Sequence, residues 1–410
     1  MVKGDRIVGI DIGTTKICTI VAEVEEEGLK ITGVGSSPSD GLKRGVVVNV
    51  DKTVRSIEQA IDKAERMSDT RITAVYAGIA GDHIRSFNSR GVIAVSGPDN
   101  EITPHDEGRV IEAAKAISIP IDREIVHVLP QDYSVDDQPG IKDPIGMSGV
   151  RLEADVHIVT GAVTSAQNIC KSIRRAGVEV VDLVLEPIAS SHSVLTPDEQ
   201  EMGVVLVDIG GGTSDIAVFY DGSIRHTAVV GLGGENVTRD VAVGLRTPFK
   251  QAEEIKRSYG CALTGLVSKE EAIEVPGVAG RPADRVERAE LASIIEARME
   301  EIFVLVNSEI RRTDYIDLLA AGVVITGGGA MVEGCVDLAE EVFGMPARLG
   351  TPRGVTGLVD AVTQPIYATG VGLVQFGLEH QHREGQFANG NGDMFNSILG
   401  RMKGWVKDFF

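Results

Sequence analysis

The chain has 410 residues, 43% of them hydrophobic, which is enough apolar material for a substantial core and excludes disorder of the chain as a whole. Its 40 basic and 60 acidic side chains give a net charge of −20. A body this acidic repels nucleic acid unless a local basic patch reverses its field. Four widely spaced cysteines, with no Cys-x-x-Cys pair, argue against a disulfide scaffold and against a structural zinc site.

The N-terminal part of the chain is predicted to form several strands and one helix. Apolar runs separated by polar turns predict strands over residues 6–10, 17–24 and 29–34. A helix is predicted after Asp51, because apolar side chains recur there every three or four positions, and a further strand over 75–80.

Residues 84–160 have a different pattern and are predicted to form a small α+β insertion. They contain a strand (91–95), a helix that begins after Thr103 and two more strands (124–129 and 150–160). Apolar and polar residues alternate in the last strand, so one of its faces is expected to be solvated.

The opening pattern recurs roughly 200 residues later, after a helix–strand unit over 165–185. A strand over 204–207 leads into Asp208-Ile209-Gly210-Gly211-Gly212-Thr213, as the first strand leads into Asp11-Ile12-Gly13-Thr14-Thr15-Lys16. A second strand follows each turn. A strand–Asp-x-Gly–strand hairpin that occurs twice predicts two related halves.

The rest of the second half is predicted to be largely helical. A helical region covers 237–260 and a long amphipathic helix covers 285–312. A buried strand over 323–326 then ends in Gly327-Gly328-Gly329, and a helix is predicted from Met331 onward.

The two Asp-x-Gly turns favour a site for phosphate and magnesium. Glycine and threonine turns leave backbone N–H groups and hydroxyls free to approach phosphate oxygens closely. The carboxylates of Asp11 and Asp208 would face Mg²⁺ and its waters, since this ion takes few protein ligands. Lys16 would reach a phosphate as a point charge. The alternative is that each turn is an ordinary hairpin connection.

Three further features are ambiguous when each is taken alone. Gly327-Gly328-Gly329 suits a flat ligand or an anion at a helix N-terminus, or a simple strand–helix turn. Gly233-Gly234 has no single interpretation. Glu253 and Lys256 share a helix face and suit a ribose and a base, or a solvated salt bridge. A Walker-type phosphate loop is absent, because the chain has no Gly-Lys dipeptide.

Taken in order, the motifs resemble the nucleotide site of the actin, sugar kinase and DnaK-type chaperone superfamily. Within it the chain is most similar to the FtsA family of bacterial division proteins, because the insertion follows Ala80 and the C-terminus matches that family's membrane-targeting helix. The superfamily motifs are Asp11-Ile12-Gly13-Thr14-Thr15, Glu186-Pro187-Ile188-Ala189, Asp208-Ile209-Gly210-Gly211-Gly212-Thr213, Gly327-Gly328-Gly329 and Thr369-Gly370-Val371-Gly372.

The resemblance implies an actin-like α/β fold. Two duplicated ATPase halves would enclose a nucleotide cleft, with an FtsA-type α+β insertion (1C) and a C-terminal amphipathic helix. The implied parts are subdomain 1A (1–83, 161–202 and 362–378), 1C (84–160), 2A (203–235 and 310–361), 2B (236–309), a flexible linker (379–393) and the membrane-targeting helix (394–410).

The resemblance also implies ATP and magnesium as cofactors. Asp11, Glu186 and Asp208 would surround the magnesium, mostly through water, and Glu186 and Asp208 would be the catalytic pair if ATP is hydrolysed. Arg298 would lie on the 2B surface that receives the C-terminal peptide of the tubulin-like protein FtsZ. The nucleotide-binding residues would be Asp11, Gly13, Thr14, Thr15, Lys16, Gly210, Gly211, Gly212, Thr213, Gly233, Gly234, Glu253, Lys256, Gly327, Gly328 and Gly329.

Residues 394–410 are predicted to form an amphipathic helix. At ~100° per residue, the nine apolar side chains cover less than half of the helical wheel and the other eight cover the rest. The alternative is a terminal helix docked on its own domain. Lipid is favoured because the chain's only Trp lies on the apolar face and basic residues border it. The expected lipid-contacting residues are Phe395, Ile398, Leu399, Met402, Trp405, Val406, Phe409 and Phe410, with Arg401 and Lys403.

The resemblance implies an ATP-binding, filament-forming protein that ties the FtsZ ring to the cytoplasmic face of the inner membrane at the division site. Its ATPase activity would be slow at most, and the 84–160 insertion would recruit later division proteins. A small-molecule kinase of the same superfamily and an adaptor like the pilus-assembly protein PilM are the alternatives.

Overall fold

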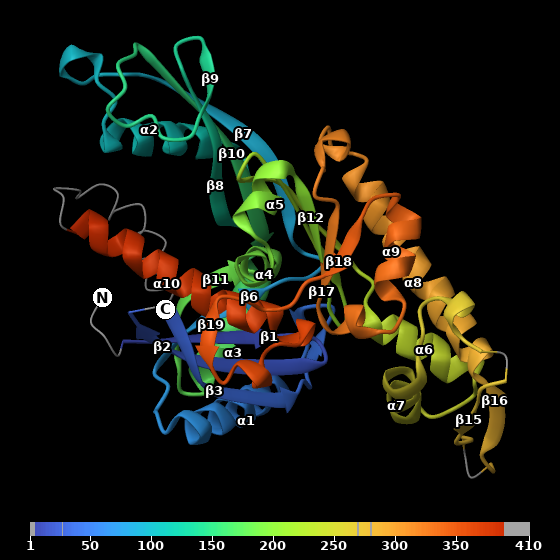
Figure 1. Ribbon diagram of the computed structural model, residues 1–410. Helices are drawn as coiled ribbons and strands as arrows, with labels where there is room; N and C mark the ends of the chain where they lie inside the picture. The colour runs from blue at the N-terminus through green and yellow to red at the C-terminus, as the bar shows by residue number, and fades with distance from the viewer. Residues whose placement is uncertain (1–4, 27, 269, 279–280, 389–410) are drawn as a thin grey trace.

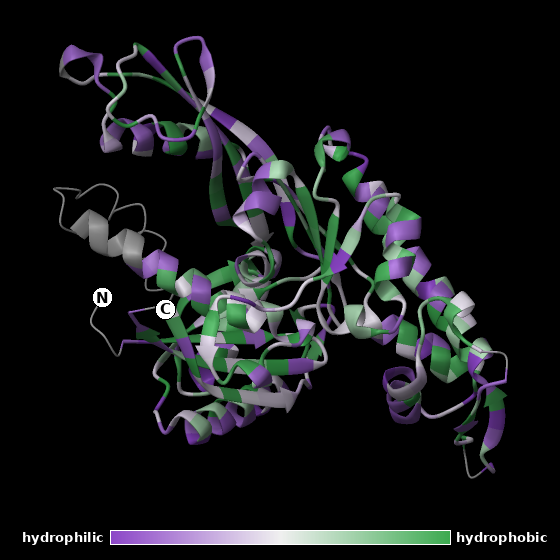
Figure 2. Cartoon of the chain, in the orientation of Figure 1, coloured by the Kyte–Doolittle hydropathy of each residue, from purple (hydrophilic) through white to green (hydrophobic). Residues whose placement is uncertain are grey.

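The computed structural model describes residues 5–26, 28–268, 270–278 and 281–388, with residues 382–388 described by their backbone. Two sheets form the centre of the molecule and a third projects from one end of it (Figure 1). Figure 2 shows that apolar residues gather along the strands of the central sheets. Within the described part of the chain, no helix is both long enough and apolar enough to cross a bilayer.

The first sheet has six strands in the order β11-β6-β1-β2-β3-β19. β1, β2 and β3 form an antiparallel meander, whereas β6 pairs parallel with β1 and β11 pairs parallel with β6. Helices α1 and α3 cover one face, and α10 with α4 covers the other. The bounds are β1 (Arg6–Ile12), β2 (Lys16–Glu25), β3 (Gly28–Pro38), β6 (Ala74–Ile79), β11 (Glu179–Leu185), β19 (Val355–Gly357), α1 (Val50–Ser68), α3 (Val163–Arg175), α4 (Glu186–Val194) and α10 (Ala368–Ala388).

Strand β1 is apolar along its length because both of its faces are buried. Successive strand side chains point to opposite faces. Ile7 therefore joins the core beneath α10, and Val8 and Ile10 join the core beneath α1. This burial explains why a continuous apolar run, rather than an alternating one, predicted the strand.

The second sheet repeats the topology of the first and confirms the expected duplication. Its order is β14-β13-β12-β17-β18, with β12, β13 and β14 antiparallel and β17 and β18 parallel to β12. Val205 and Val207 face α8, whereas Val204 and Leu206 join the core of the first half. The bounds are β12 (Val204–Ile209), β13 (Ser214–Tyr220), β14 (Ser223–Val230), β17 (Val323–Thr326), β18 (Ala347–Leu349) and α8 (Arg288–Ile310).

The insertion is an α+β unit, as expected. Its sheet has the order β7-β10-β8-β9, and helix α2 packs against β7 and β10. Thr103 and Asp106 form a reciprocal capping box at the start of α2. The strands are longer than the sequence predicted. The bounds are β7 (Arg85–Ala94), α2 (Pro104–Lys115), β8 (Arg123–Val135), β9 (Gln138–Ile141) and β10 (Arg151–Ala162).

One helix prediction in the second half is refined and another needs correction. The helical region 237–260 consists of two helices, because the chain turns at Arg246, which has a left-handed φ of 49°, and the second helix begins after Pro248. The helix expected from Met331 begins at Cys335, after a 3₁₀ turn over Gly328–Met331. The remaining bounds are β4 (Leu42–Lys43), β5 (Val46–Val47), α5 (Pro197–Met202), α6 (Gly234–Gly244), α7 (Phe249–Tyr259), β15 (Ala272–Val275), β16 (Asp284–Glu287) and α9 (Cys335–Phe343).

Helix α10 also corrects the linker expected over 379–393, because it continues through Ala388. Its first half is packed on the first sheet, and a helix that has already formed extends at little cost through good helix formers. Gly385 is unfavourable by only about 1 kcal/mol in such a position. Residues 389–393 and the expected membrane helix 394–410 lie outside the described residues.

Candidate functional site

The two Asp-x-Gly turns have matching geometry. The N–H of Gly13 donates to the carbonyl of Lys16 (3.0 Å), and the N–H of Gly210 donates to the carbonyl of Thr213 (2.9 Å). Asp11 and Asp208 are each the penultimate residue of their strand. Across the hairpins, Asp11 is opposite Cys18 and Asp208 is opposite Asp215.

The two turns lie against each other. A methyl group added to Gly211 would stand 2.5 Å from Cγ2 of Thr15, and one added to Gly212 would stand 2.8 Å from Oγ1 of Thr14. The hydroxyl of Thr14 in turn accepts a hydrogen bond from the N–H of Gly45 (3.1 Å). Turns that are far apart in sequence thus bring glycine backbone and threonine hydroxyls together.

Four carboxylates gather beside these turns. Burial raises the pKa of Asp11 to about 6, with Lys16 opposing and Asp208 adding to the rise. Burial and repulsion from Asp208 raise the pKa of Asp215 to about 8. The pKa of Glu186 is raised well above its usual value by burial and by repulsion from Asp11, and burial also raises that of Asp208. The cluster therefore resists full ionisation until a cation approaches.

Asp208 is held in place by two hydroxyls. Its Oδ2 accepts hydrogen bonds from Ser190 (2.6 Å) and Thr369 (3.2 Å). Gly327 allows this packing, because its φ of 85° is left-handed and a Cβ there would lie 2.3 Å from Oδ1 of Asp208. Glu186 begins α4 and packs against Gly78 at the end of β6.

Lys16 lies at the junction between the first turn and the residues that precede α10. Its Nζ donates to the carbonyl of Ile366 and stands 4.4 Å from the ring centre of Tyr367. The lysine is the cation that opposes the raised pKa of both Asp11 and Asp208. Its charge is therefore close enough to stabilise the ionised forms of both carboxylates.

The carboxylates fit a magnesium ion bound largely through water. Among the described residues, no group of three His, Cys, Asp or Glu side chains is placed to hold an ion directly. Oδ1 of Asp215 is buried without a hydrogen-bond partner in the described part of the chain, while the hydroxyls of Thr213 and Ser190 donate to Asp215 and Asp208. A divalent cation with its own waters would supply both the missing donors and the missing charge.

The residues expected to contact ribose and base also meet. Nζ of Lys256 donates to the carbonyl of Gly234 (3.0 Å) and to Thr238 (2.7 Å), and lies 2.7 Å from Glu253. Burial favours a higher pKa for Glu253, but Lys256 and Thr238 hold it below its usual value. Gly329 lies 3.9 Å from the position of a Cβ on Gly234.

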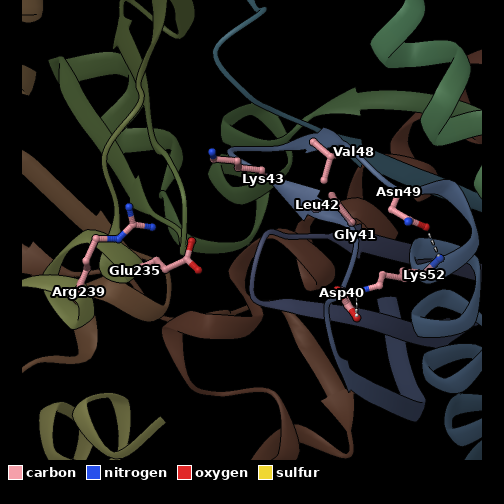
Figure 3. A pocket seen from close by; sticks show the side chains of 9 residues that line it. All are labelled: Asp40, Gly41, Leu42, Lys43, Val48, Asn49, Lys52, Glu235 and Arg239. Atoms are coloured by element: carbon pink, nitrogen blue, oxygen red, sulfur yellow. Dashed lines mark hydrogen bonds and ion pairs between the residues drawn. The ribbon is translucent and has the colours of Figure 1, made fainter. Parts of the chain in front are cut away.

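A pocket of about 340 Å³ opens beside the turns, between the first half and α6 (Figure 3). It adjoins the second turn, since the N–H of Glu235 donates to the carbonyl of Gly211 (2.8 Å). The pocket was not assigned from sequence. Its lining residues are Asp40, Gly41, Leu42, Lys43, Val48, Asn49, Lys52, Glu235 and Arg239.

The residue expected on the partner surface lies on the long helix α8. Arg298, on α8, is ion-paired with Asp240 of α6 (2.5 Å) and with Glu301, and hydrogen bonding to Asp240 raises its pKa. The expected lipid-contacting residues of 394–410 lie outside the part of the chain that the structure describes.

The sequence missed several partners of these residues. Asp215 follows the second turn by two positions, and the tight hairpin register could have placed it opposite Asp208. Ser190 and Thr369 lie within or just beyond quoted motifs, but their contacts with Asp208 depend on tertiary structure. No local signal identifies Ile366 or Tyr367 as neighbours of Lys16.

Solved structures with the same fold define the class. A chain of the PilM–PilN type IV pilus biogenesis complex superposes with a TM-score of 0.64, 16% identity and coverage of 91% of this chain and 98% of that one. MreB5 of Spiroplasma citri bound to ADP superposes with a TM-score of 0.57 and 13% identity, covering 94% of this chain and 99% of that one. The MamK double helical filament superposes with a TM-score of 0.53 and 12% identity, covering 91% of this chain and 98% of that one. Duplicated halves with paired turns make this an actin-like protein.

Sequence relatives define the family more narrowly. A model described as Cell division protein FtsA matches residues 205–372, and one described as SHS2 domain inserted in FTSA matches residues 81–160. FtsA of Pseudomonas aeruginosa is 51% identical over 100% of this chain and 99% of its own length, and FtsA of Escherichia coli K12 is 42% identical over 98% and 96%. The chain belongs to the FtsA family of cell division proteins.

Proposed function

We propose that this division protein binds ATP with magnesium between its two Asp-x-Gly turns. The observation that carries the proposal is the contact between the two turns, with Gly211 against Thr15 and Gly212 against Thr14. The MreB5 structure, whose fold is similar, is bound to ADP. Backbone N–H groups and threonine hydroxyls would hold the phosphates, and Lys16 would neutralise part of their charge.

The carboxylates have separate roles in this proposal. Asp11 and Asp208 would orient waters around the magnesium, and the hydroxyls of Ser190 and Thr369 fix Asp208 for that task. When bound, magnesium supplies positive charge against the phosphate oxygens. Glu186 would orient a water toward the terminal phosphate. The ATP hydrolysis that we propose is slow at most.

The wider role that we propose is to anchor the FtsZ ring. The chain would form actin-like filaments, consistent with its likeness in fold to the MamK filament. Arg298 would contribute to the surface for the FtsZ C-terminal peptide, and the 84–160 insertion would recruit later division proteins. Residues 394–410 would attach the protein peripherally to anionic lipid on the cytoplasmic face of the inner membrane, at the division site.

Substitution of Asp208 tests the nucleotide site. Asp208→Asn keeps the shape of the side chain and removes its charge, so magnesium-dependent ATP affinity is expected to fall about tenfold or more, equal to ~1.4 kcal/mol. Isothermal titration calorimetry with ATP, with and without magnesium, measures the change.

Asp137→Asn is the matched control, because the Asp137 side chain is fully exposed in the insertion and the substitution removes the same charge. Its ATP affinity should equal that of the parent. An Asp208→Asn variant that binds ATP in magnesium as tightly as the parent would contradict the proposed site.

A further inference from the structure

The insertion is joined to one half of the molecule and docked on the other. Both of its covalent connections lead to the first half, since β6 ends at Ile79 before it and α3 begins at Val163 after it. The strands at its base, however, pack against β14, the outer strand of the second sheet. Figure 1 shows the long strands β7, β8 and β10 reaching from the insertion toward that sheet.

An ion pair lies at the centre of this interface. Arg225 of β14 is paired with Asp132 of β8, and the Arg225 side chain is only 7% exposed. Nζ of Lys142 lies 2.7 Å from Oδ1 of Asp132 and 2.8 Å from Oδ2 of Asp221. Although burial opposes it, hydrogen bonds from Arg225 and Lys142 hold the pKa of Asp132 below its usual value.

Buried polar side chains complete the interface. Nε2 of Gln131 donates to the carbonyl of Ile224 (2.8 Å), and the hydroxyl of Ser86 donates to the carbonyl of Thr227 (2.7 Å). Nε2 of His157 lies 2.9 Å from Oγ1 of Thr227. Gln131, His157 and Thr227 are all buried. Opening the interface would leave these groups without partners, which is unfavourable for each of them.

The same strand leads directly into the nucleotide site. Val229 and Val230 of β14 pair with Asp215 and Ser214 of β13, and the hydroxyl of Ser214 donates to the carbonyl of Leu232 (2.9 Å). Arg225 and Val229 are only four residues apart, or about 13 Å along an extended strand. One short strand therefore carries the docking face for the insertion and also pairs with the strand that holds Asp215.

We propose that β14 couples the insertion to the nucleotide site. Docking of the insertion on β14 supports the arrangement in which the two Asp-x-Gly turns touch, and so slows release of bound nucleotide. The inference rests on the proposed binding of ATP. By thermodynamic linkage, a protein that binds the insertion and pulls it from β14 weakens nucleotide binding, and nucleotide strengthens the docking to the same degree.

Two variants weaken the docking by different means, and a third variant serves as the control. Lys142→Gln removes a partly exposed cation that bridges Asp132 and Asp221, so the fold should be retained. Arg225→Lys keeps the charge but loses the forked geometry of the guanidinium. Lys115→Gln is the matched control, because Lys115 lies in the same insertion and pairs within its own helix, with Glu112.

Release of a fluorescent ATP analogue from the intact chain is measured by stopped flow in magnesium. Both docking variants should release it about fivefold faster or more than the parent, because coupling between sites typically changes affinity by at least this factor and most changes in affinity lie in the dissociation rate. Lys115→Gln should release it at the parent rate. Hydrogen exchange of residues 221–230, measured on the same samples without nucleotide, should be faster in the docking variants.

The outcomes separate this inference from the proposed function. If the parent binds the analogue but the docking variants release it at the parent rate, the coupling is wrong and nucleotide binding stands. Unchanged hydrogen exchange in both variants would show that these side chains do not hold the insertion, which also overturns the coupling. A parent that binds no analogue would remove both proposals.

Discussion

At the scale of single residues, the candidate site centres on four acids beside Lys16. Asp11 and Asp208 were expected from their motifs, because a turn that is short and rich in glycine fixes where its preceding carboxylate lies. Asp215 was not expected, although its carboxylate interacts electrostatically with those of Asp208 and Asp11. Ser190 and Thr369 could not be predicted, since a hydroxyl carries no sequence signal for a partner that only the fold brings near.

The raised carboxyl pKa values predict how stability depends on pH. An acid whose pKa is higher in the folded state binds more protons there than in the unfolded chain, so the free energy of unfolding falls as pH rises between the two values. For Asp215 this window runs from about 4 to about 8. Buried His127, with a pKa lowered to about 4 by burial and by His380, acts in the opposite direction below its unfolded value of 6.5.

A comparison of variants isolates the contribution of the carboxyl. Without nucleotide or magnesium, the free energy of unfolding of the parent should fall between pH 5 and pH 8. The fall in Asp215→Asn should be smaller by at least about 1 kcal/mol, roughly the free energy that corresponds to one pKa unit. Chemical denaturation at the two pH values measures this, and exposed Asp137→Asn should follow the parent. Equal losses in Asp215→Asn and in the parent would mean that Asp215 ionises normally in the folded chain.

At the scale of elements, strands buried on both faces were predictable and short edge strands were not. The apolar runs at β1 and β12 are strong signals because tertiary packing requires them. β18 and β19 have three residues each, and nothing local marks them. The linker prediction failed at 379–388 for a related reason, since polar composition does not show whether a packed helix precedes the segment.

The capping box of α2 gives a prediction for one element. Thr103→Ala removes the hydroxyl that accepts from the N–H of Asp106 (3.3 Å) and donates to its carboxylate (2.6 Å). The loss should be about 1 kcal/mol of local stability in α2. Hydrogen exchange of the α2 amides should become about fivefold faster, which corresponds to that free energy.

The same substitution at a second capping box is the control. Thr196 and Glu199 form an equivalent box at the start of α5, so Thr196→Ala should speed exchange in α5 and leave α2 unchanged. Exchange in α2 that is unaffected by Thr103→Ala would show that packing alone holds this helix in place.

At the scale of the whole molecule, the duplication was predictable from sequence, but the packing of the two halves and of the insertion against one another was not. Two Asp-x-Gly hairpins predicted two halves, and the halves repeat one topology. The buried core that runs between them, with Leu206 and Ala217 beside Ile188, follows from side-chain packing that no motif encodes. The docking of the insertion on β14 likewise depends on contacts between residues far apart in the chain.

Membrane attachment is a prediction for the intact chain. Trp405→Glu places a charge on the expected apolar face, so co-sedimentation with anionic liposomes should fall several-fold, because the binding strength depends on buried apolar area. Ser397→Glu adds the same charge on the expected polar face and should retain substantially more binding. If Trp405→Glu sediments with lipid as the parent does, this helix is not the lipid anchor.

A crystal structure of the chain with magnesium and a non-hydrolysable ATP analogue tests the central claim most directly. The account predicts triphosphate density between the turns at Asp11 and Asp208, with the sugar and base near Lys256 and Gly329. An analogue bound elsewhere, or a cleft that stays empty at saturating analogue, would contradict it.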